Sequence, residues 1–477
     1  MSAHTPAPPS SRRWIALALI ALAQFMVIMD TSIIGVALPK MQDSLGFSQE
    51  NLSWVFNAYV VVFGGLLLLG GKLSDILGAR RIFQAGWAIL GAGSLVAGLA
   101  SSATVELIGR GVQGAGAALI APSALTLLMM LFGSNPRELT KAFAVYGAAA
   151  PAGGTAGVFL GGVITEYASW PWVFYINIPL ALLALVAAPL LLPSGALAPH
   201  GSVDLLGAVT ATLGLGAAVF AVVRAPESGW LSGSTWGVLA IAAVLLAAFI
   251  ALQVRRREPL MPLSVFRSPN LGAANLAQVL LGAAWVPMWF FLNLYLQQVL
   301  GYSAFPSGAA LLPMTALIMV GMVALSPKLF VRFGARTMIV TGLLLLAAGL
   351  VWLSFIRPDG NFWIDVLPGS LVAALGMSLA FVPSLQTAIS AAPPQEGGLA
   401  SGIVNTSYQI GSALGLAVVT AIAAAAGTET LGDTVALTDG FQAAFRTAAL
   451  IGVIAAVAAA VTFRRPARTV EEVPAQV

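Results

Sequence analysis

The sequence predicts an all-α integral membrane protein. Three observations support this class: composition, the length of the apolar runs and the placement of basic residues. Of its 477 residues, 59% are hydrophobic and 8% are charged, whereas soluble proteins carry roughly 25% charged residues. Because hydrocarbon offers backbone groups no hydrogen-bond partner, only helical bundles or closed barrels can cross it. Apolar runs of about 20 residues fit helices, since barrel strands need only about 10.

Fourteen apolar runs of helical length are expected to cross the membrane. The first seven lie at 14–38, 52–71, 82–100, 105–132, 141–165, 172–192 and 203–223. The other seven lie at 236–254, 273–299, 307–331, 336–356, 364–390, 399–426 and 443–463.

Basic residues predict the orientation, because cytoplasmic loops carry an excess of lysine and arginine. Of the 22 lysines and arginines, Arg110 falls inside a span, and only Lys40, Arg224, Arg357 and Arg446 fall in or beside the loops on one side. The others lie at the termini and in the alternate loops. We therefore expect both termini in the cytoplasm, and a multi-pass protein of the cell (inner or plasma) membrane.

Two of the expected cytoplasmic loops repeat one pattern. Lys72-Leu73, four residues and Gly78-Ala79-Arg80 follow the second span, and Lys328-Leu329, four residues and Gly334-Ala335-Arg336 follow the tenth. Chance similarity between basic loops is one explanation. Two homologous six-span halves are the other, with spans seven and eight inserted between them, an organisation typical of secondary transporters.

The repeat predicts the domain organisation. We expect a cytoplasmic tail at 1–13, an N-terminal six-helix bundle at 14–193 and an inserted two-helix hairpin at 203–254. A C-terminal six-helix bundle at 272–463 and a second cytoplasmic tail at 464–477 complete the chain.

Several motifs together resemble the major facilitator superfamily, specifically its fourteen-span branch of drug:proton antiporters related to quaternary-ammonium exporters. In the N-terminal half they are Met29-Asp30-Thr31 with Leu38-Pro39 in the first span, Gly71 to Arg81 after the second span and Arg110 to Gly116 in the fourth span. In the C-terminal half they are Tyr295 to Pro313 around the ninth and tenth spans and Gly398 to Gly415 in the thirteenth span. In the fifth-span motif Val158 replaces the usual proline. The resemblance implies the major facilitator fold and proton-coupled export of small hydrophobic or cationic compounds by alternating access.

Asp30 is the leading candidate for proton coupling, because an ionised carboxylate at membrane depth costs at least a few kcal/mol unless it is paired or hydrated. Asp30 and Arg110 lie roughly 12 and 8 Å from the outer ends of their spans at about 1.5 Å per residue. They are therefore expected to meet, either as a fixed structural ion pair or as a switchable one. Glu106, one turn before Arg110 on the same face, is either an interfacial charge or a second protonation site.

The motif after the second span is expected to form a gating loop. Its residues are Gly71, Asp75, Gly78, Arg80 and Arg81. By resemblance, the lone acid among bases latches the two halves in one state and releases them in the other. The alternative is a basic loop that only sets topology.

Two stripes of small residues have the four-residue spacing that lets helices pack closely. They are Gly153, Gly157 and Gly161, joined by Gly162 of the fifth-span motif, and Ser407, Gly411 and Gly415. We expect them to form smooth contacts between the halves that allow rocking.

A substrate chamber is predicted from polar and aromatic residues within spans, since small-molecule sites are apolar with a few polar groups. The candidates are Trp54, Asn57, Tyr59, Asn275, Gln278, Trp285, Trp289, Asn293, Gln297, Gln386, Asn405 and Gln409. Bonds between neighbouring helices are the other explanation for such amides. Apart from Asp365 near a span end, the C-terminal half carries no carboxylate within a span, which disfavours dicationic substrates.

Other activities are disfavoured. No Gly-x4-Gly-Lys-Ser/Thr loop is present, so ATP hydrolysis of that type is not expected, and the absence of cysteine excludes thiol sites and disulfides. We expect no metal, no cofactor and no nucleic-acid partner, but a small-molecule substrate, protons taken from the gradient and a lipid environment, in a monomer. A dedicated exporter of one metabolite or antibiotic and a proton-coupled importer remain alternatives, and a membrane enzyme is the least supported.

Overall fold

The computed structural model describes residues 10–47, 54–194, 204–256, 259, 270–392, 397–428 and 433–463. Nearly all of them are helical. The expected tail at 464–477 and most of the tail at 1–13 lie outside the described residues, and α1 already begins at Ser10.

The N-terminal helices are α1 (Ser10–Leu45), α2 (Trp54–Leu77), α3 (Ala79–Gly98), α4 (Ala103–Phe132), α5 (Pro136–Tyr167), α6 (Trp172–Tyr175) and α7 (Asn177–Leu191). Next come α8 (Leu205–Ser228) and α9 (Gly233–Arg255). The C-terminal helices are α10 (Leu271–Gln298), α11 (Ala304–Ala310), α12 (Leu312–Val320), α13 (Ser326–Leu353), α14 (Leu367–Ser390), α15 (Gly397–Ala423) and α16 (Thr434–Thr462), with π-helical turns at Gly321–Leu325, Phe362–Val366 and Ala424–Thr428.

Eleven helical stretches among the described residues are long and apolar enough to cross a membrane. One of them, Phe305–Leu353, has 49 residues. At about 1.5 Å per residue this stretch is more than twice the roughly 30 Å of a hydrocarbon core. It is interrupted at Gly334, where φ is 74°, so it consists of two helical segments joined by a turn.

The outer faces of the helices are apolar and exposed. On α7, Leu182, Leu183, Val186 and Leu190 are each more than half exposed. α9 is more extreme, because few of its side chains are buried. Exposed apolar surface on this scale has to be covered by another apolar phase, so these faces contact lipid.

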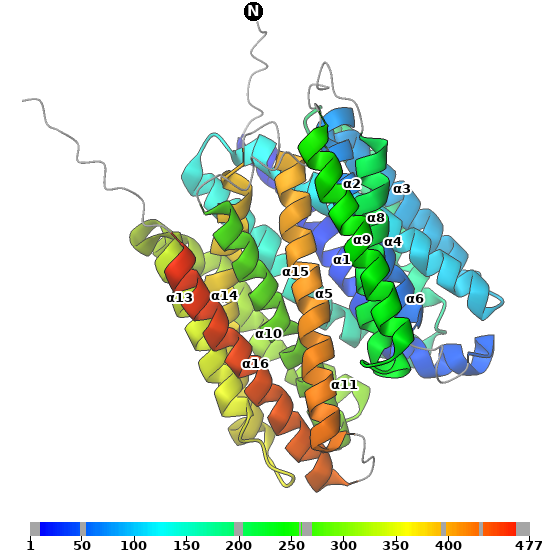
Figure 1. Ribbon diagram of the computed structural model, residues 1–477, viewed down its shortest axis with the longest axis vertical. Coiled ribbons are helices and arrows are strands. Elements are labelled where there is room, and N and C mark those ends of the chain that lie inside the picture. Colours follow the sequence, from blue (N-terminus) through cyan, green and yellow to red (C-terminus); the bar gives the residue numbers. More distant parts are fainter. Residues whose placement is uncertain are drawn as a thin grey trace, which may run out of the picture.

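The helices form two bundles with α8 and α9 beside them (Figure 1). Helices α1 to α7 pack chiefly on one another, as do α10 to α16. The bundles meet where α15 packs on α2 and α4, and where α5 packs on α11 and α12. The α8–α9 hairpin packs through α8 on α2 and α15, and it therefore lies against both bundles.

The repeated sequence pattern adopts the same structure in both bundles. Gly78 and Gly334 both have positive φ, 90° and 74°, a region that glycine enters without the steric cost a Cβ imposes. Two residues later, Arg80 donates to the carbonyl of Leu192 after α7, and Arg336 donates to the carbonyl of Ala460 in α16. Each arginine therefore binds the end of the last long helix of its own bundle, which supports an internal duplication.

The expected gating loop is not a loop. α2 continues through Gly71 and Asp75 to Leu77, and α3 begins at Ala79 and includes Arg80 and Arg81. Gly78 alone makes the turn, because its left-handed backbone reverses the chain within one residue.

The small-residue stripes pack within bundles, so the expectation that they lie between the halves was wrong. A Cβ on Gly153, Gly157 or Gly161 would lie within 3 Å of a backbone carbonyl oxygen of α1. A Cβ on Gly411 or Gly415 would do the same against α10. Gly162 was also wrongly assigned, because nothing lies within 4 Å of its Cβ position. The stripes let α5 approach α1, and α15 approach α10, closely enough for backbone contact.

Candidate functional site

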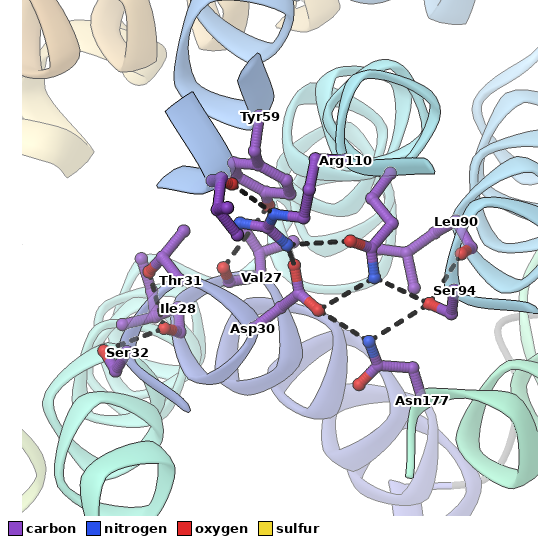
Figure 2. Close-up of polar contacts among 12 residues, drawn as sticks. Val27, Ile28, Asp30, Thr31, Ser32, Tyr59, Leu90, Ser94, Arg110 and Asn177 are labelled. Atoms are coloured by element: carbon purple, nitrogen blue, oxygen red, sulfur yellow. Dashed lines mark hydrogen bonds and ion pairs between the residues drawn. The ribbon is translucent and has the colours of Figure 1, made fainter. Parts of the chain in front are cut away.

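Asp30 and Arg110 form a fully buried ion pair. α1 carries Asp30 and α4 carries Arg110, and both side chains are 0% exposed. Nη1 of Arg110 donates to Oδ2 of Asp30 at 2.7 Å. The expected pairing is therefore present, at the centre of a polar network shown in Figure 2.

Amide and hydroxyl groups complete the shell of the carboxylate. Oδ1 of Asp30 accepts from Gln113 Nε2 at 3.0 Å and from Asn177 Nδ2 at 2.6 Å. Both amides also donate to Ser94 Oγ, at 2.8 and 3.1 Å. Gln113 in turn accepts from Arg110 at 2.7 Å. The network joins α1, α3, α4 and α7, so hydrogen bonds connect the Asp30 carboxylate to side chains on three other helices.

The guanidinium is also held from α2. Nε of Arg110 donates to the carbonyl of Val55 at 2.8 Å, and Cζ lies 4.7 Å from the centre of the Tyr59 ring. The Tyr59 hydroxyl reaches the carbonyl of Val27 on α1 at 3.4 Å. Tyr59, expected in a substrate chamber, is instead buried beside the ion pair.

Such a pair is costly to disturb. Removing one partner of a buried, hydrogen-bonded ion pair typically costs about 3–5 kcal/mol, because the other charge is left without compensation. Protonation of Asp30 has a similar consequence, since it removes the negative charge and leaves Arg110 as a buried cation. The ion pair therefore contributes to holding the surrounding helices together.

Glu106 is not a charge at a water interface. Its side chain is 0% exposed in α4, and neither carboxyl oxygen has a hydrogen-bond partner among the described residues. This burial contradicts the interfacial interpretation and leaves the protonation-site interpretation open.

A separate apolar cluster lies at the end of the N-terminal bundle that carries the α1–α2 connection. It is built by Ile33, Ile34, Ala37, Met41, Phe47, Val55, Ala97, Trp170, Val173 and Phe174. We call it the apolar cap. Because Val55 belongs to the apolar cap and also binds Arg110, the cap lies directly beside the ion-pair network.

Most of the amides expected in a substrate chamber instead bond to other parts of the protein. Asn275 accepts from Ser407, joining α10 to α15, and Gln278 donates to the Ser384 hydroxyl and the Phe381 carbonyl of α14. Asn293 accepts from Gln297 and from Ser307 of α11, and Asn405 donates to its own helix at Ser401. The bonds of Asn275, Gln278 and Ser307 join different helices of the C-terminal bundle, whereas the other two lie within one helix.

Gln386 joins the two bundles. Its amide donates to the Thr140 hydroxyl of α5 at 3.0 Å. Near the other end of α5, the Phe159 ring lies 5.2 Å from that of Phe305 in α11. The bundles therefore touch at both ends of α5.

The remaining chamber candidates are spread over several elements. Trp285 and Trp289 lie one above the other on α10 with ring centroids 6.5 Å apart, and Trp289 approaches Gly154 of α5. Trp54 packs on Phe220 of α8. Gln409 is partly buried in α15, and the Asn57 side chain lies outside the described residues.

Three residues of the site, Gln113, Ser94 and Asn177, were not predicted from the sequence. Gln113 follows Arg110 by three residues on the same helix face, a signal that was available. Ser94 and Asn177 carry no charge and belong to distant spans, so only the packing of α3 and α7 against α4 and α1 reveals them.

Comparisons with known proteins agree with this architecture. The family model described as Major Facilitator Superfamily matches residues 20–416 and 332–476. The chain is 40% identical to a cephamycin export protein of Amycolatopsis lactamdurans over 84% of this chain and 83% of that protein. It is 37% identical to a puromycin resistance protein of Streptomyces alboniger over 89% and 84%. The structure of a human organic anion transporter superposes with a TM-score of 0.69 at 15% identity, covering 94% of this chain and 100% of that one.

Proposed function

Because the chain belongs to the major facilitator superfamily, and is thus a multi-pass membrane transporter and not an enzyme, we propose that it exports small hydrophobic or cationic compounds in exchange for protons. The names of its relatives support this direction, since they include cephamycin export and puromycin resistance proteins. The fully buried Asp30–Arg110 pair is the observation that supports proton coupling.

In the proposed cycle, a proton from the outer side binds Asp30 and weakens its pairing with Arg110. The network through Gln113 and Asn177 then changes its arrangement, and the bundles rock about the fixed site. Release of the proton to the cytoplasm restores the pair. One proton carries about 1.4 kcal/mol per pH unit and about 2.3 kcal/mol per 100 mV, which together sustain a gradient of roughly a few hundredfold for a neutral substrate. Exchange for a monocation moves no net charge, so only the pH difference drives it.

The proposed topology has fourteen spans with both termini in the cytoplasm. Division of Phe305–Leu353 at Gly334, together with α3 and α8, adds three crossings to the eleven long apolar stretches. In this arrangement 14–193 and 272–463 are the two bundles and 203–254 is the inserted hairpin. The shared geometry of Gly78 and Gly334 supports it.

With this orientation the apolar cap faces outward, and the two contacts of α5 become gates. The Thr140–Gln386 bond closes the cytoplasmic side, while Phe159 on Phe305 closes the outer side. Alternating access then requires one contact to open while the other holds. Asp75, at the cytoplasmic end of α2, is proposed to bias this choice. A monomer contains all of these parts.

Substrates are proposed to bind between α5 and α10, where Trp289 faces Gly154. A site built from tryptophan rings selects for apolar area and accepts organic cations through the ring faces. Export of a single metabolite or antibiotic remains a second candidate, which the named specificity of the cephamycin export relative favours.

Everted membrane vesicles test the proposal. Ethidium should accumulate inside them when respiration acidifies the lumen, and a protonophore should abolish the accumulation. Accumulation that persists with the protonophore would remove proton coupling, whereas ethidium loss would indicate import. A panel of unrelated antibiotics then separates a broad exporter from a dedicated one.

A further inference from the structure

A second buried carboxyl lies one helical turn from Arg110. Glu106 is 0% exposed, and both of its carboxyl oxygens lack hydrogen-bond partners among the described residues. Arg110 has an unused donor as well, because its Nη2 atom has no partner among them. Residues four apart lie on one face of a helix. An unused donor and two unused acceptors are therefore neighbours in a site from which water is excluded.

Charge balance indicates how the proton is distributed. Arg110 supplies one positive charge, which the Asp30 carboxylate already balances, with Oδ2 of Asp30 2.7 Å from Nη1 of Arg110. A second carboxylate without a partner would be an uncompensated buried anion, which is far more costly than a neutral carboxyl. Tyr59 of α2, whose ring covers the guanidinium, is a further titratable group beside this pair in the described part of the chain. Glu106 therefore holds its proton while Arg110 pairs with Asp30.

We propose, resting on the function proposed above, that Arg110 exchanges carboxyl partners during transport. It pairs with Asp30 while Glu106 is protonated, and with Glu106 while Asp30 is protonated. In the exchange the O–H bond at Glu106 breaks and an O–H bond forms at Asp30, while the guanidinium shifts from one carboxylate to the other. One proton, one anion and one cation are present before and after the exchange, so this step does not change the net charge of the cluster.

The surroundings of Arg110 suit such a shift. The Tyr59 ring supports the guanidinium from one face without fixing its rotation in the plane, and Nη2 is a donor that no group in the described part of the chain uses. Glu106 precedes Leu107, which packs against the apolar cap. Glu106 lies in the first turn of α4, one turn before Arg110, on the side from which the proposed orientation brings protons.

The complete cycle moves one proton. Asp30 releases the transferred proton to the cytoplasm, Arg110 returns to Asp30, and Glu106 is left as an unpaired buried carboxylate. Glu106 then takes a proton from the outer side. The exchange thereby gives the coupling a direction, since the outer proton enters at one carboxyl and leaves from the other.

Infrared difference spectroscopy of the purified, full-length protein tests the exchange directly. The carbonyl stretch of a protonated carboxyl should be present in the wild type at neutral pH and absent in Glu106→Gln. It should be unchanged in Glu138→Gln, which removes a partly exposed carboxylate paired with Arg13. In Asp30→Asn the band should also disappear, although Glu106 is intact, because Arg110 then takes Glu106 as its only anionic partner.

A Glu106 band missing from the wild type, or one that remains in Asp30→Asn, would overturn the proposal. If gel filtration shows that Asp30→Asn does not fold, the transport kinetics of Glu106→Gln test the proposal instead. Its turnover should fall about tenfold or more, with altered pH dependence and unchanged substrate affinity, since a factor of ten corresponds to a barrier of about 1.4 kcal/mol.

The two proposals fail differently. Substrate accumulation by the wild type that persists with a protonophore would remove the proposed function itself. If Asp30→Asn is inactive while Glu106→Gln has wild-type turnover and pH dependence, the proton coupling stands and only the partner exchange is wrong.

Discussion

The two bundles share their packing but not their chemistry. The stripe of α5 packs on α1 in the same register as the stripe of α15 on α10, because Gly157 meets the carbonyl of Met29 and Gly411 meets that of Val279. The close contacts of α3 with α4 recur between α13 and α14. Gly93 packs against the backbone carbonyl of Gly109, and Gly349 packs against that of Gly369 in the same way.

The contacts of α3 with α4 and of α13 with α14, together with the turns at Gly78 and Gly334, match Arg110 with Ser370, Gln113 with Ala373 and Asp75 with Val331. Helix α10, the counterpart of α1, carries no aspartate, glutamate, lysine or arginine that could correspond to Asp30. The duplicated scaffold therefore carries the charged groups of this site in its N-terminal copy only. Close helix packing requires small residues in both copies, whereas one charged site is sufficient for one proton.

The largest expected effect comes from the carboxyl that the C-terminal bundle lacks. Asp30→Asn should reduce proton-driven efflux to background, because the side chain keeps its shape but cannot exchange a proton. The matched control is Asp365→Asn, which removes a carboxylate that binds Arg357 at 2.9 Å in the C-terminal bundle. Efflux that depends on Asp365 and not on Asp30 would place proton coupling in the C-terminal bundle instead of the N-terminal one.

The shared packing should respond alike in both bundles. Gly157→Ala and Gly411→Ala should each lower the free energy of unfolding by about 1–3 kcal/mol, as overpacking does, with the larger loss at Gly411, where a Cβ would lie 1.9 Å from the Val279 oxygen. Thermal unfolding in detergent measures this loss. Gly162→Ala is the control and should be neutral, because its Cβ position is open. Equal stability of all three variants would contradict the packing.

Asp75 and Val331 occupy matched positions in the two copies of the repeated motif, so substitutions there can be compared directly. Asp75→Ala should slow efflux severalfold while substrate affinity stays unchanged, since the acid is proposed to bias the conformational step. Val331→Ala, at the matched and exposed position of α13, should leave the rate unaltered. Initial efflux rates over a range of substrate concentrations separate the two quantities. A pure loss of affinity in Asp75→Ala would argue for a binding role.

The smallest effect is expected at the contact between bundles. Gln386→Ala removes one hydrogen bond to Thr140, worth about 1 kcal/mol, and should shift the protein towards its inward-open form. Cysteine pairs placed across this contact can report the shift by crosslinking, because the native chain has no cysteine. Gln409→Ala, partly buried in α15, serves as the control. Unchanged crosslinking in Gln386→Ala would show that this bond is not part of a gate.

The sequence allowed the helices to be predicted far better than their polar contacts. Apolar runs located each helix, although they missed the extension of α1 to Leu45 and the start of α16 at Thr434, because polar helical turns beyond the hydrocarbon carry no hydropathy signal. Charge and depth correctly brought Asp30 to Arg110. The partners Ser94 and Asn177 were not predicted, since uncharged residues are selected here by tertiary packing alone. Amides such as Gln278 and Gln386 were assigned to substrate, whereas the structure uses them between helices.

The most direct test is transport by purified protein in liposomes, driven only by a pH gradient. Wild-type protein should concentrate substrate against its gradient while protons move the opposite way. Asp30→Asn should exchange labelled for unlabelled substrate at equilibrium yet accumulate none. Accumulation by Asp30→Asn at the wild-type level would show that the buried ion pair of the N-terminal bundle is structural and that protons are coupled elsewhere.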